Sequence, residues 1–505
     1  MRGAIAAGHP LTAETGARVL AQGGNAVDAC VAAGFASWVA ESPLTGPGGG
    51  GFMLVHRARD RTTRLLDFFV DVPGLGLDHR AAEMEQIDVE FPESSQAFRI
   101  GAASCAVPGA PAGLEEAHRA FGSQPWRTLV EPAIEMARSG VELTRPQAHL
   151  HAVVDLILRH SQEGRAIYGP EGRRLVAGDV LVQGDLATTL ERLAERGAFQ
   201  VYGGEVGRAI VRHVQDRGGS ITLRDLEQYR VIRRRPVRAA FCGHELASNP
   251  PPSTGGVLIG YGLCILERLG AGGPPGSAGA MARLVEIMRE QNRARDRRFG
   301  RDLHRGGLVR KLFEDDALAA AAERVRGTTQ ISVVDERGNA ASMTASTGTG
   351  SGVVVPGTGI HMNNMLGEFD LAGTGTGRPG TRMTSMMAPS VVLRDGLPRL
   401  VVGSAGSGRL RGAIMQIVIN SVAHDLPVEE AIGRPRVHFE DPHVHCEGGS
   451  DPVELDRLEE LGYDVVGWRR RNLFFGGASA VEMRADGGLA AAGDPRRGGA
   501  GTVVE

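Results

Sequence analysis

The pattern of hydrophobic residues changes close to residue 327. Before residue 320 most apolar residues recur every three or four positions, which is typical of amphipathic helices. After residue 327 apolar and polar residues alternate in short runs, which is typical of strands, and the first two predicted strands are joined by a tight turn over Glu336–Asn339. A helix-rich first part followed by a strand-rich second part favours an α+β fold with helices layered outside sheets.

Two of the predicted helices have recognisable starts. The first covers residues 12–41, and Thr12 is placed to cap it. A late helix has Asp451 at the N-cap and Pro452 at the first helical position, a combination that favours a helix start. The other predicted helices cover residues 109–122, 128–140, 186–197, 277–299 and 411–425.

The composition argues against several classes of partner. With 505 residues, of which 42% are hydrophobic, the chain can bury a large core and form more than one cooperative unit. The formal net charge is −3, and Lys311 is the only lysine. The arginines are scattered and matched by acidic residues, so we expect no nucleic-acid partner. The densest arginine runs, 233–235 and 469–471, are expected to be solvated surface.

The cysteines and the apolar runs predict a compartment. The five cysteines are odd in number and widely spaced, which favours reduced thiols over a disulfide framework. The first residues show no apolar segment of signal-peptide length, and no window holds 18 uninterrupted apolar residues. We therefore expect a cytoplasmic protein without a membrane partner.

Two threonines, Thr328 and Thr329, open the first predicted strand after Gly327. Threonine is a good strand former, so this placement alone has a simple structural explanation. A threonine hydroxyl also becomes a nucleophile when a base lies beside it, and the α-amine of an N-terminal threonine is such a base. That arrangement requires the chain to be cut between Gly327 and Thr328. The residues leave both readings open.

Longer segments around these threonines decide in favour of chemistry. In order along the chain they read AAGHPLTAETGARVLAQGGNAVDACVAA, GPGGGGFML, NPPPSTGG, TTQISVVDERGNAASMT, SGVVVPGTGIHMNN, SMMAPSVVLRDG, GSAGSGR and GDPRRGGAG. These segments are spread along nearly the whole chain, and the chain resembles the γ-glutamyltranspeptidase family over nearly all of it. A single match of this kind can arise by chance, whereas the ordered set cannot.

The resemblance implies a fold, a maturation step and a catalytic set. The fold would be the αββα sandwich of N-terminal-nucleophile hydrolases. The precursor would cut itself into a large piece, 1–327, and a small piece, 328–505, which stay together as one compact unit with Thr328 as nucleophile. Ser346 would support the nucleophile, with Thr344 on the same strand face. The backbone N–H groups of Gly406 and Ser407 would form the oxyanion hole. The family needs no cofactor or metal.

The segments that would bind a glutamyl group depart from the family pattern. Phe69 stands where an arginine would bind the α-carboxylate, and an aromatic ring cannot replace that ion pair. Next to Asn364, Met365 replaces a residue that contacts the amine, and Glu368 replaces an aspartate that binds the α-ammonium.

Two further positions in the expected substrate pocket also differ from the family. Ser385 is kept while Met386 replaces a second serine, and Gly348 replaces an asparagine. We expect weak or absent glutathione hydrolysis, because a site that has lost its matched donors binds the polar substrate poorly.

Three weaker motifs were also considered. The glycine run 46–51 lacks the phosphate-binding spacing of nucleotide sites. His438, His443, His445 and Cys446 lie close together in sequence, but a lone His-x-His is more often strand surface than zinc ligand, so we predict no metal. The methionine-rich stretch 383–387 can be adaptable core packing, and we favour a substrate-pocket wall because the matching family segment lines the pocket.

Two classes of function remain at this stage. The favoured one is a self-cleaving amide or acyl hydrolase or transferase that acts on a small molecule. Within it, the alternative is a C–C bond hydrolase recruited to an antibiotic pathway that uses proline-like intermediates. The second class is an uncleaved, non-catalytic binding protein, which the retention of Thr328, Ser346 and Gly406 argues against.

Overall fold

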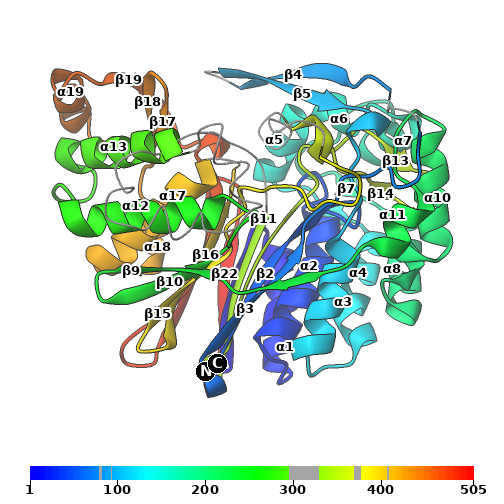
Figure 1. Ribbon diagram of the computed structural model, residues 1–505, viewed down its shortest axis with the longest axis horizontal. Coiled ribbons are helices and arrows are strands. Elements are labelled where there is room, and N and C mark those ends of the chain that lie inside the picture. Colours follow the sequence, from blue (N-terminus) through cyan, green and yellow to red (C-terminus); the bar gives the residue numbers. More distant parts are fainter. Residues whose placement is uncertain (79–81, 92–93, 295–328, 369–376, 407–408) are drawn as a thin grey trace.

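Two antiparallel β-sheets face each other at the centre of the molecule, with helices on the outer side of each (Figure 1). The computed structural model describes residues 1–78, 82–91, 94–294, 329–368, 377–406 and 409–505. In the first sheet the strand order is β22 (Ala500–Val504), β1 (Gly3–Ala7), β11 (Thr329–Asp335), β12 (Ala340–Ser346), β2 (Gly50–Arg57), β3 (Thr62–Phe68) and β8 (Ile232–Arg234). In the second it is β21 (Leu489–Gly493), β20 (Gly477–Met483), β16 (Leu397–Ala405), β15 (Ser390–Arg394), β10 (His244–Ser248) and β9 (Val237–Phe241). The α+β prediction is confirmed.

Both sheets combine strands from the two sides of residue 327. In the first sheet β11 pairs with β1 on one side and β12 on the other, and β12 in turn pairs with β2. In the second sheet β10 pairs with β15. The N- and C-terminal strands β1 and β22 also pair, so the chain ends lie side by side (Figure 1). The early and late parts of the chain therefore share their hydrogen-bond ladders.

Helices cover the outer face of each sheet (Figure 1). The first sheet is covered by α1 (Pro10–Ala21), α2 (Ala26–Ala40), α3 (Ala110–Phe121), α4 (Trp126–Ser139), α8 (Gly184–Arg196) and α10 (Glu205–Gln215). The second is covered by α12 (Gly255–Leu269), α13 (Ala278–Ala294), α17 (Arg409–Val418) and α18 (Val428–Gly433). Every residue of α2 is buried, because this helix lies between the first sheet and the helices outside it.

Smaller elements complete the described fold. Two small sheets lie outside the sandwich, β4 (Glu85–Phe91) with β5 (Ser94–Ile100), and β17 (Val437–Glu440) with β18 (His443–Cys446) and β19 (Asp464–Gly467). The remaining short strands are β6 (Val141–Glu142), β7 (Val180–Leu181), β13 (Val354–Val355) and β14 (Ile360–His361). The remaining helices are α5 (Arg145–Val153), α6 (Asp155–Leu158), α7 (Gln162–Tyr168), α9 (Phe199–Tyr202), α11 (Leu223–Gln228) and α19 (Pro452–Glu460). None of the helices described is long and apolar enough to cross a membrane.

The predicted bounds of the first helix were wrong. Residues 12–41 form two helices, because Asn25 caps α2 and exchanges hydrogen bonds with Asp28 in a capping box. His9, and not Thr12, caps α1, and Thr12 lies inside the helix with its side chain bonded elsewhere. The late helix α19 begins as predicted, with Asp451 at its N-cap.

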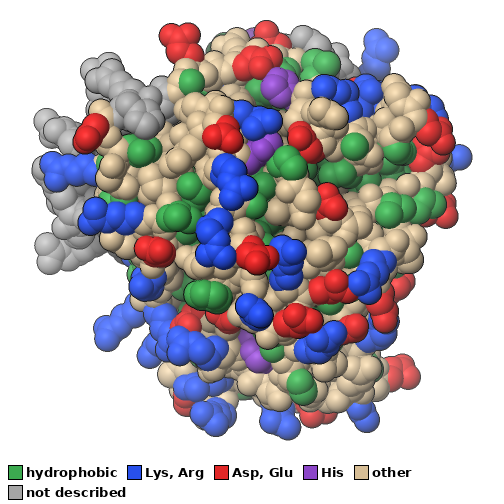
Figure 2. Space-filling view, turned by 90° about the vertical axis from the view of Figure 1, so that its right-hand side faces the viewer, with side chains coloured by type: hydrophobic (Ala, Val, Ile, Leu, Met, Phe, Trp, Pro, Cys, Tyr) green, Lys and Arg blue, Asp and Glu red, His purple; other side chains and the backbone are tan. Residues whose placement is uncertain are grey.

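Charged residues on the surface are mixed in sign. Figure 2 shows basic and acidic side chains interspersed over most of the face formed by the helices outside the first sheet. This distribution agrees with the scattered charges of the sequence and gives this face no extended basic patch of the kind that nucleic acids bind.

Four ionised side chains form a buried cluster near the edge of the second sheet. Asp494 accepts hydrogen bonds from Arg436 at 2.6 Å and from Arg496 at 3.0 Å, and also from the backbone of Ala478 at 2.9 Å. Arg496 in turn bonds Glu447. Burial alone would raise the pKa of Asp494, but the two arginine charges outweigh it, so the pKa is lowered. The cluster ties the small sheet to strand β20.

Asp494→Asn should therefore lower the free energy of unfolding by about 3–5 kcal/mol, because it leaves buried cations without their partner. The difference from wild type should shrink as pH falls below about 4 towards the lowered pKa, where the native aspartate is also protonated. Urea unfolding measured between neutral and acidic pH tests this. Asp425→Asn is the control, since Asp425 is exposed and its contact with Arg399 is 3.4 Å long. Equal effects of the two substitutions would contradict the interpretation.

Candidate active site

The predicted nucleophile position adjoins a well-ordered strand pair. Strand β11 begins at Thr329, which pairs with Ala345 of β12, and the last residue of β12 is Ser346. Gly327, Thr328 and Ser407 lie outside the described residues. The structure therefore shows the surroundings of the predicted nucleophile, which consist of the two faces of β11, the end of β12 and the loop that follows it.

On the helix-facing side, a buried carboxyl holds the start of β11. Thr329 Oγ1 donates to Glu41 Oε2 at 2.6 Å, and Thr12 Oγ1 donates to Glu41 Oε1 at 2.9 Å. Glu41 is 3% exposed, and burial raises its pKa against the effect of these two hydrogen bonds and of the Arg497 charge. A side chain on Gly8 would place its Cβ 2.2 Å from Glu41 Oε2, so glycine is required there. Glu41 thus joins the end of α2 to helix α1 and strand β11.

On the opposite face of β11, a buried polar network crosses to the second sheet. Thr344 Oγ1 donates to Gln330 Oε1 at 2.6 Å, and Gln330 Nε2 donates to Ser342 Oγ at 2.9 Å. A Cβ on Gly403 of β16 would lie 2.1 Å from Gln330 Oε1, so the amide packs directly against that backbone. Thr344 and Ser342 share this face because residues two apart on a strand point the same way. The predicted Thr344 is thus placed by Gln330, which the sequence analysis did not single out.

The end of β12 gathers four of the predicted residues. Ser346 Oγ accepts a hydrogen bond from the N–H of Gly348 at 2.8 Å, and Asn364 Oδ1 accepts one from the N–H of Thr349 at 3.0 Å. Gly348 has φ +72°, and a Cβ there would lie 2.1 Å from Asn364 Oδ1 and 3.1 Å from Glu368 Oε1. Ser346, Gly348, Asn364 and Glu368 therefore belong to one buried group, in which glycine is needed for both conformation and space.

The side chain of the neighbouring Asn363 holds this loop in place through hydrogen bonds. Its side-chain N–H groups donate to the carbonyls of Gly48 and Ala106, each at 2.8 Å, and its oxygen accepts from the N–H groups of Ala106 and Met365. Sequence reasoning missed this role. The signal for it was the Asn-Asn pair that follows strand β14.

Gly406 lies at the same end of the sandwich. Strands β12 and β16 run in the same direction where Ser342 Oγ donates to the Val402 carbonyl at 3.3 Å, so both reach their last residues on one side. Gly406 has φ +117°, and a Cβ there would lie 2.5 Å from the Cα of Gly476. The backbone at the predicted oxyanion position therefore depends on two glycines in contact.

An apolar wall beside Thr344 is formed by residues that are buried between the two sheets. The ring of Phe69 stacks on that of Phe52, with centroids 5.5 Å apart and planes at 16°, and Phe52 is the cross-strand partner of Thr344. Met365 belongs to the same buried cluster, together with Met383 and Met387 of the methionine-rich stretch 383–387. The predicted Phe69 and Met365 are therefore brought together beside Thr344.

Met386 and Ser385 make contacts away from the apolar wall that contains Met383 and Met387. Met386 packs into the core between the second sheet and its helices, where the Thr254 hydroxyl contacts its sulfur. The carbonyl of Ser385 accepts hydrogen bonds from the Ser253 hydroxyl at 3.0 Å and from the Thr254 N–H at 2.7 Å. The stretch 383–387 thus divides between the two cores, and Met386 serves packing where the structure describes it.

The histidines near β18 make separate contacts. His443 Nδ1 lies 2.8 Å from Asp464, while His445 Nδ1 accepts a hydrogen bond from the indole of Trp468 at 3.2 Å. Burial, together with the charges of Arg409 and Arg411, lowers the pKa of His438 well below its usual value. Among the residues described, no three His, Cys, Asp or Glu side chains are grouped as metal ligands would be.

Two facing sheets between helical layers, with the buried Thr329 at the start of β11, form the architecture of N-terminal-nucleophile hydrolases. The comparisons with known proteins place the chain within that class. The family model described as Gamma-glutamyltranspeptidase matches residues 12–504. The chain belongs to the γ-glutamyltranspeptidase family and is one of its hydrolases or transferases, as the sequence predicted.

The relatives carry two kinds of name. The Glutathione hydrolase proenzyme of Escherichia coli (strain K12) is 31% identical over 98% of this chain and 90% of its own length. The Acylase ACY 1 proenzyme of Pseudomonas sp. (strain V22) is also 31% identical, over 97% of this chain and 91% of its own length.

Solved structures confirm the fold. The cephalosporin acylase from Bacillus halodurans superposes with a TM-score of 0.83 at 24% identity, covering 100% of this chain and 96% of its own. Helicobacter pylori γ-glutamyltranspeptidase superposes with a TM-score of 0.53 at 30% identity, covering 61% of this chain and 88% of its own.

Replacing Glu41 with leucine should destabilise the start of β11. The change leaves two buried hydroxyls, of Thr12 and Thr329, without their acceptor, and each such loss costs about 1–3 kcal/mol. The midpoint of urea unfolding measures the effect. Glu14→Leu on the exposed face of α1 is the matched control. If both variants unfold at the same urea concentration, Glu41 does not hold the strand start.

Proposed function

We propose that the protein is a self-processing amide or acyl hydrolase in which Thr328 is the nucleophile. The proposal is supported by the geometry around the first residue of β11, since Glu41 holds Thr329 on one face and Gln330 with Thr344 fixes the other. Residue 328 comes two positions before Gln330, and residues two apart in an extended strand share a face. The proposal assigns the Thr328 hydroxyl to the side of Thr344, Ser346 and the Gly406 loop.

The proposed reaction uses the chain's own groups. Thr328 Oγ attacks the substrate carbonyl, and the α-amine freed by cleavage at Gly327–Thr328 takes the hydroxyl proton. The N–H groups of Gly406 and Ser407 stabilise the negative oxygen that develops. The same amine then gives its proton to the leaving nitrogen, which leaves an ester on Thr328. Water, or an amine acceptor, attacks that ester and releases the acyl group.

The two fragments would remain associated after cleavage. In the first sheet, strands from residues 1–294 pair directly with strands from residues 329–505, as β1 does with β11 and β2 does with β12. Separating them would break these ladders and expose the core between the sheets. The proenzyme names of the relatives agree with such a processed protein.

The apolar wall carries the inference about substrate. Phe69 stacks on Phe52 beside Thr344, and Met365, Met383 and Met387 belong to the same buried cluster. An aromatic ring replaces the cation that would bind a free carboxylate, while Glu368 keeps one acidic group beside Gly348. We infer that the acyl group of the substrate is apolar and carries no free α-carboxylate. A relative named acylase aligns with 97% of this chain.

The same nucleophile would also serve the C–C bond hydrolysis of a proline-like intermediate that the sequence leaves open. That alternative remains a prediction, as does the cytoplasmic location.

The proposal predicts self-cleavage between Gly327 and Thr328. The wild-type protein should run on a denaturing gel as two fragments, with the smaller one starting at Thr328, whereas Thr328→Ala should stay a single chain because it removes the attacking hydroxyl. Thr188→Ala, at an exposed position on α8, is the control and should be cleaved like wild type. An uncleaved wild-type chain would contradict the proposal.

The substrate preference follows from the apolar wall. Phenylacetyl-4-nitroanilide should be hydrolysed with a kcat/KM at least about tenfold above that for γ-glutamyl-4-nitroanilide, which corresponds to about 1.4 kcal/mol in transition-state binding. Phe69→Leu should lower the first value and leave the second little changed, while Phe199→Leu on the surface should alter neither. Faster turnover of glutathione and the γ-glutamyl anilide would overturn the inferred substrate class.

A further inference from the structure

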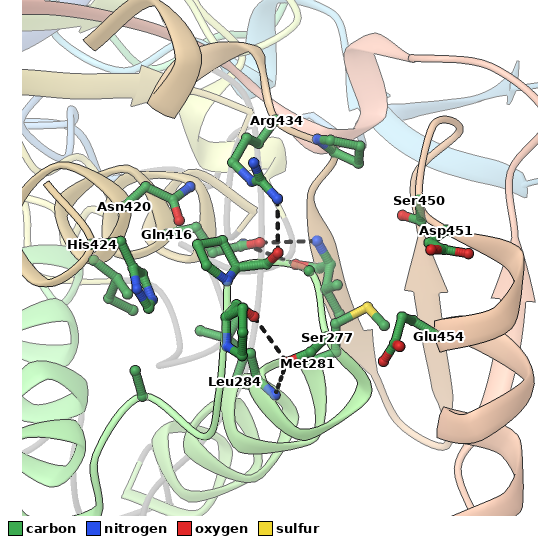
Figure 3. A pocket seen from close by; sticks show the side chains of 18 of the residues that line it. Ser277, Met281, Leu284, Gln416, Asn420, His424, Arg434, Ser450, Asp451 and Glu454 are labelled. Carbon is green, nitrogen blue, oxygen red and sulfur yellow. Dashed lines mark hydrogen bonds between the residues drawn. The ribbon is translucent and has the colours of Figure 1, made fainter. Parts of the chain in front are cut away.

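A cavity away from the predicted active site lies among the helices that cover the second sheet (Figure 3). Its volume is about 430 Å³, which falls within the range of small-molecule binding sites. Its walls come from α12, α13, the turn after α17, strand β17 and the start of α19. The residues predicted for the active site do not line it.

The cavity is separated from the predicted active site by helix α17. This helix begins at Arg409, directly after the Gly406 loop, and ends at Val418, so its ten residues span about 15 Å. The next residues, Ile419 and Asn420, already line the cavity. The two sites lie at opposite ends of one helix.

One wall carries hydrogen-bond donors. Asn420, His424 and Arg434 lie around one side of the cavity in Figure 3. Arg434 Nη1 contacts Glu430 at 3.0 Å and Nη2 donates to the Pro275 carbonyl at 2.7 Å, so the guanidinium group is held in place at the cavity. Burial, and then the charge of Arg434, lower the pKa of His424, so its ring is neutral at pH 7 and donates one N–H.

The side chains of Asn420 and His424 make no hydrogen bond within the described part of the chain. Both belong to the π-helical turn over Ile419–Ala423 and the residue that follows it. A π-helical turn is rare and occurs most often at functional sites. Here it brings two polar side chains to the wall that also carries Arg434.

The opposite wall is acidic and the floor is apolar. Glu454 Oε2 accepts a hydrogen bond from the N–H of Ala278 at 2.7 Å, and that bond, with the charge of Arg457, lowers the pKa of Glu454. Asp451 lies beside it, and both stand across the cavity from Asn420 and His424 (Figure 3). The apolar lining includes Leu266, Met281, Leu284, Ile419 and Val437.

We propose that this cavity is a ligand site for a small zwitterion with an apolar side chain, of the size of an amino acid or a dipeptide. Its carboxylate lies against Arg434, Asn420 and His424, because these residues offer N–H donors. Arg434 is the only cation among the three, and its ion pair with Glu430 holds it in place. Its ammonium group faces Asp451 and Glu454. Its side chain covers Met281 and Leu284, which removes apolar surface from water.

Calorimetric titration with glycyl-L-leucine tests the proposal on the wild-type protein. We expect saturable binding, with N-acetyl-L-leucinamide and isopentylamine binding about tenfold more weakly, because each lacks the carboxylate that accepts a charge-assisted hydrogen bond. Absence of binding up to about 10 mM dipeptide would overturn the proposal, since such an affinity is too weak for a specific site.

Variants locate the bound dipeptide. Leu284→Trp should abolish binding by filling the cavity, and Arg434→Gln should weaken it about tenfold. Arg293→Gln removes a matched arginine–glutamate pair on the exposed part of α13 and should leave the affinity unchanged. Asn420→Leu removes a second hydrogen-bond donor from the same wall as Arg434 and should also weaken binding. Circular dichroism shows whether each variant is folded. Unchanged affinity in Leu284→Trp, or lost binding in Ser346→Ala, would place the dipeptide elsewhere and contradict the proposal.

Discussion

The hydrogen bond between Thr329 and Glu41 fixes the part of the molecule on which the proposed chemistry depends. It joins the first described residue of β11 to the end of α2, and Thr12 joins α1 to the same carboxyl. On the other face, Gln330 bonds Thr344 and packs against Gly403 of the second sheet. A strand start held on both faces by buried hydrogen bonds has little freedom to move. Such rigidity is what a nucleophile at this position needs, since small displacements slow the attack on a carbonyl.

The hydrogen-bonded residues at the end of β12 and the residues of the apolar wall serve different purposes. Ser346, Gly348 and Asn364 form a buried hydrogen-bonded group at the end of β12, and Gly406 depends on close contact with Gly476. These features suit any acyl transfer. The stack of Phe69 on Phe52, by contrast, replaces the cation that the family resemblance implies for a glutamyl carboxylate. In the proposed function, the reaction class and the substrate class therefore depend on different residues, and one can change while the other is kept.

Much of the fold was accessible from the sequence because long ordered motifs and strand alternation agree with each other. The α+β layers, the turn after β11 and the start of α19 follow from local patterns. Glu41 was missed because its partner Thr329 lies 288 positions away, and no local pattern reveals such a pairing. The break between α1 and α2 was missed because the helical period continues across Asn25. The methionines of 383–387 were assigned to one wall, although the segment is irregular and its residues divide between two cores.

The central claim is that Thr328 carries the acyl group during turnover. The most direct measurement is the intact mass of the smaller fragment after brief reaction with 4-nitrophenyl phenylacetate, followed by peptide mapping. The account predicts one phenylacetyl group, attached to the peptide that begins with Thr328, and its loss on longer incubation with water. Acylation of any other residue, or turnover by a cleaved protein without acylation of Thr328, would contradict it.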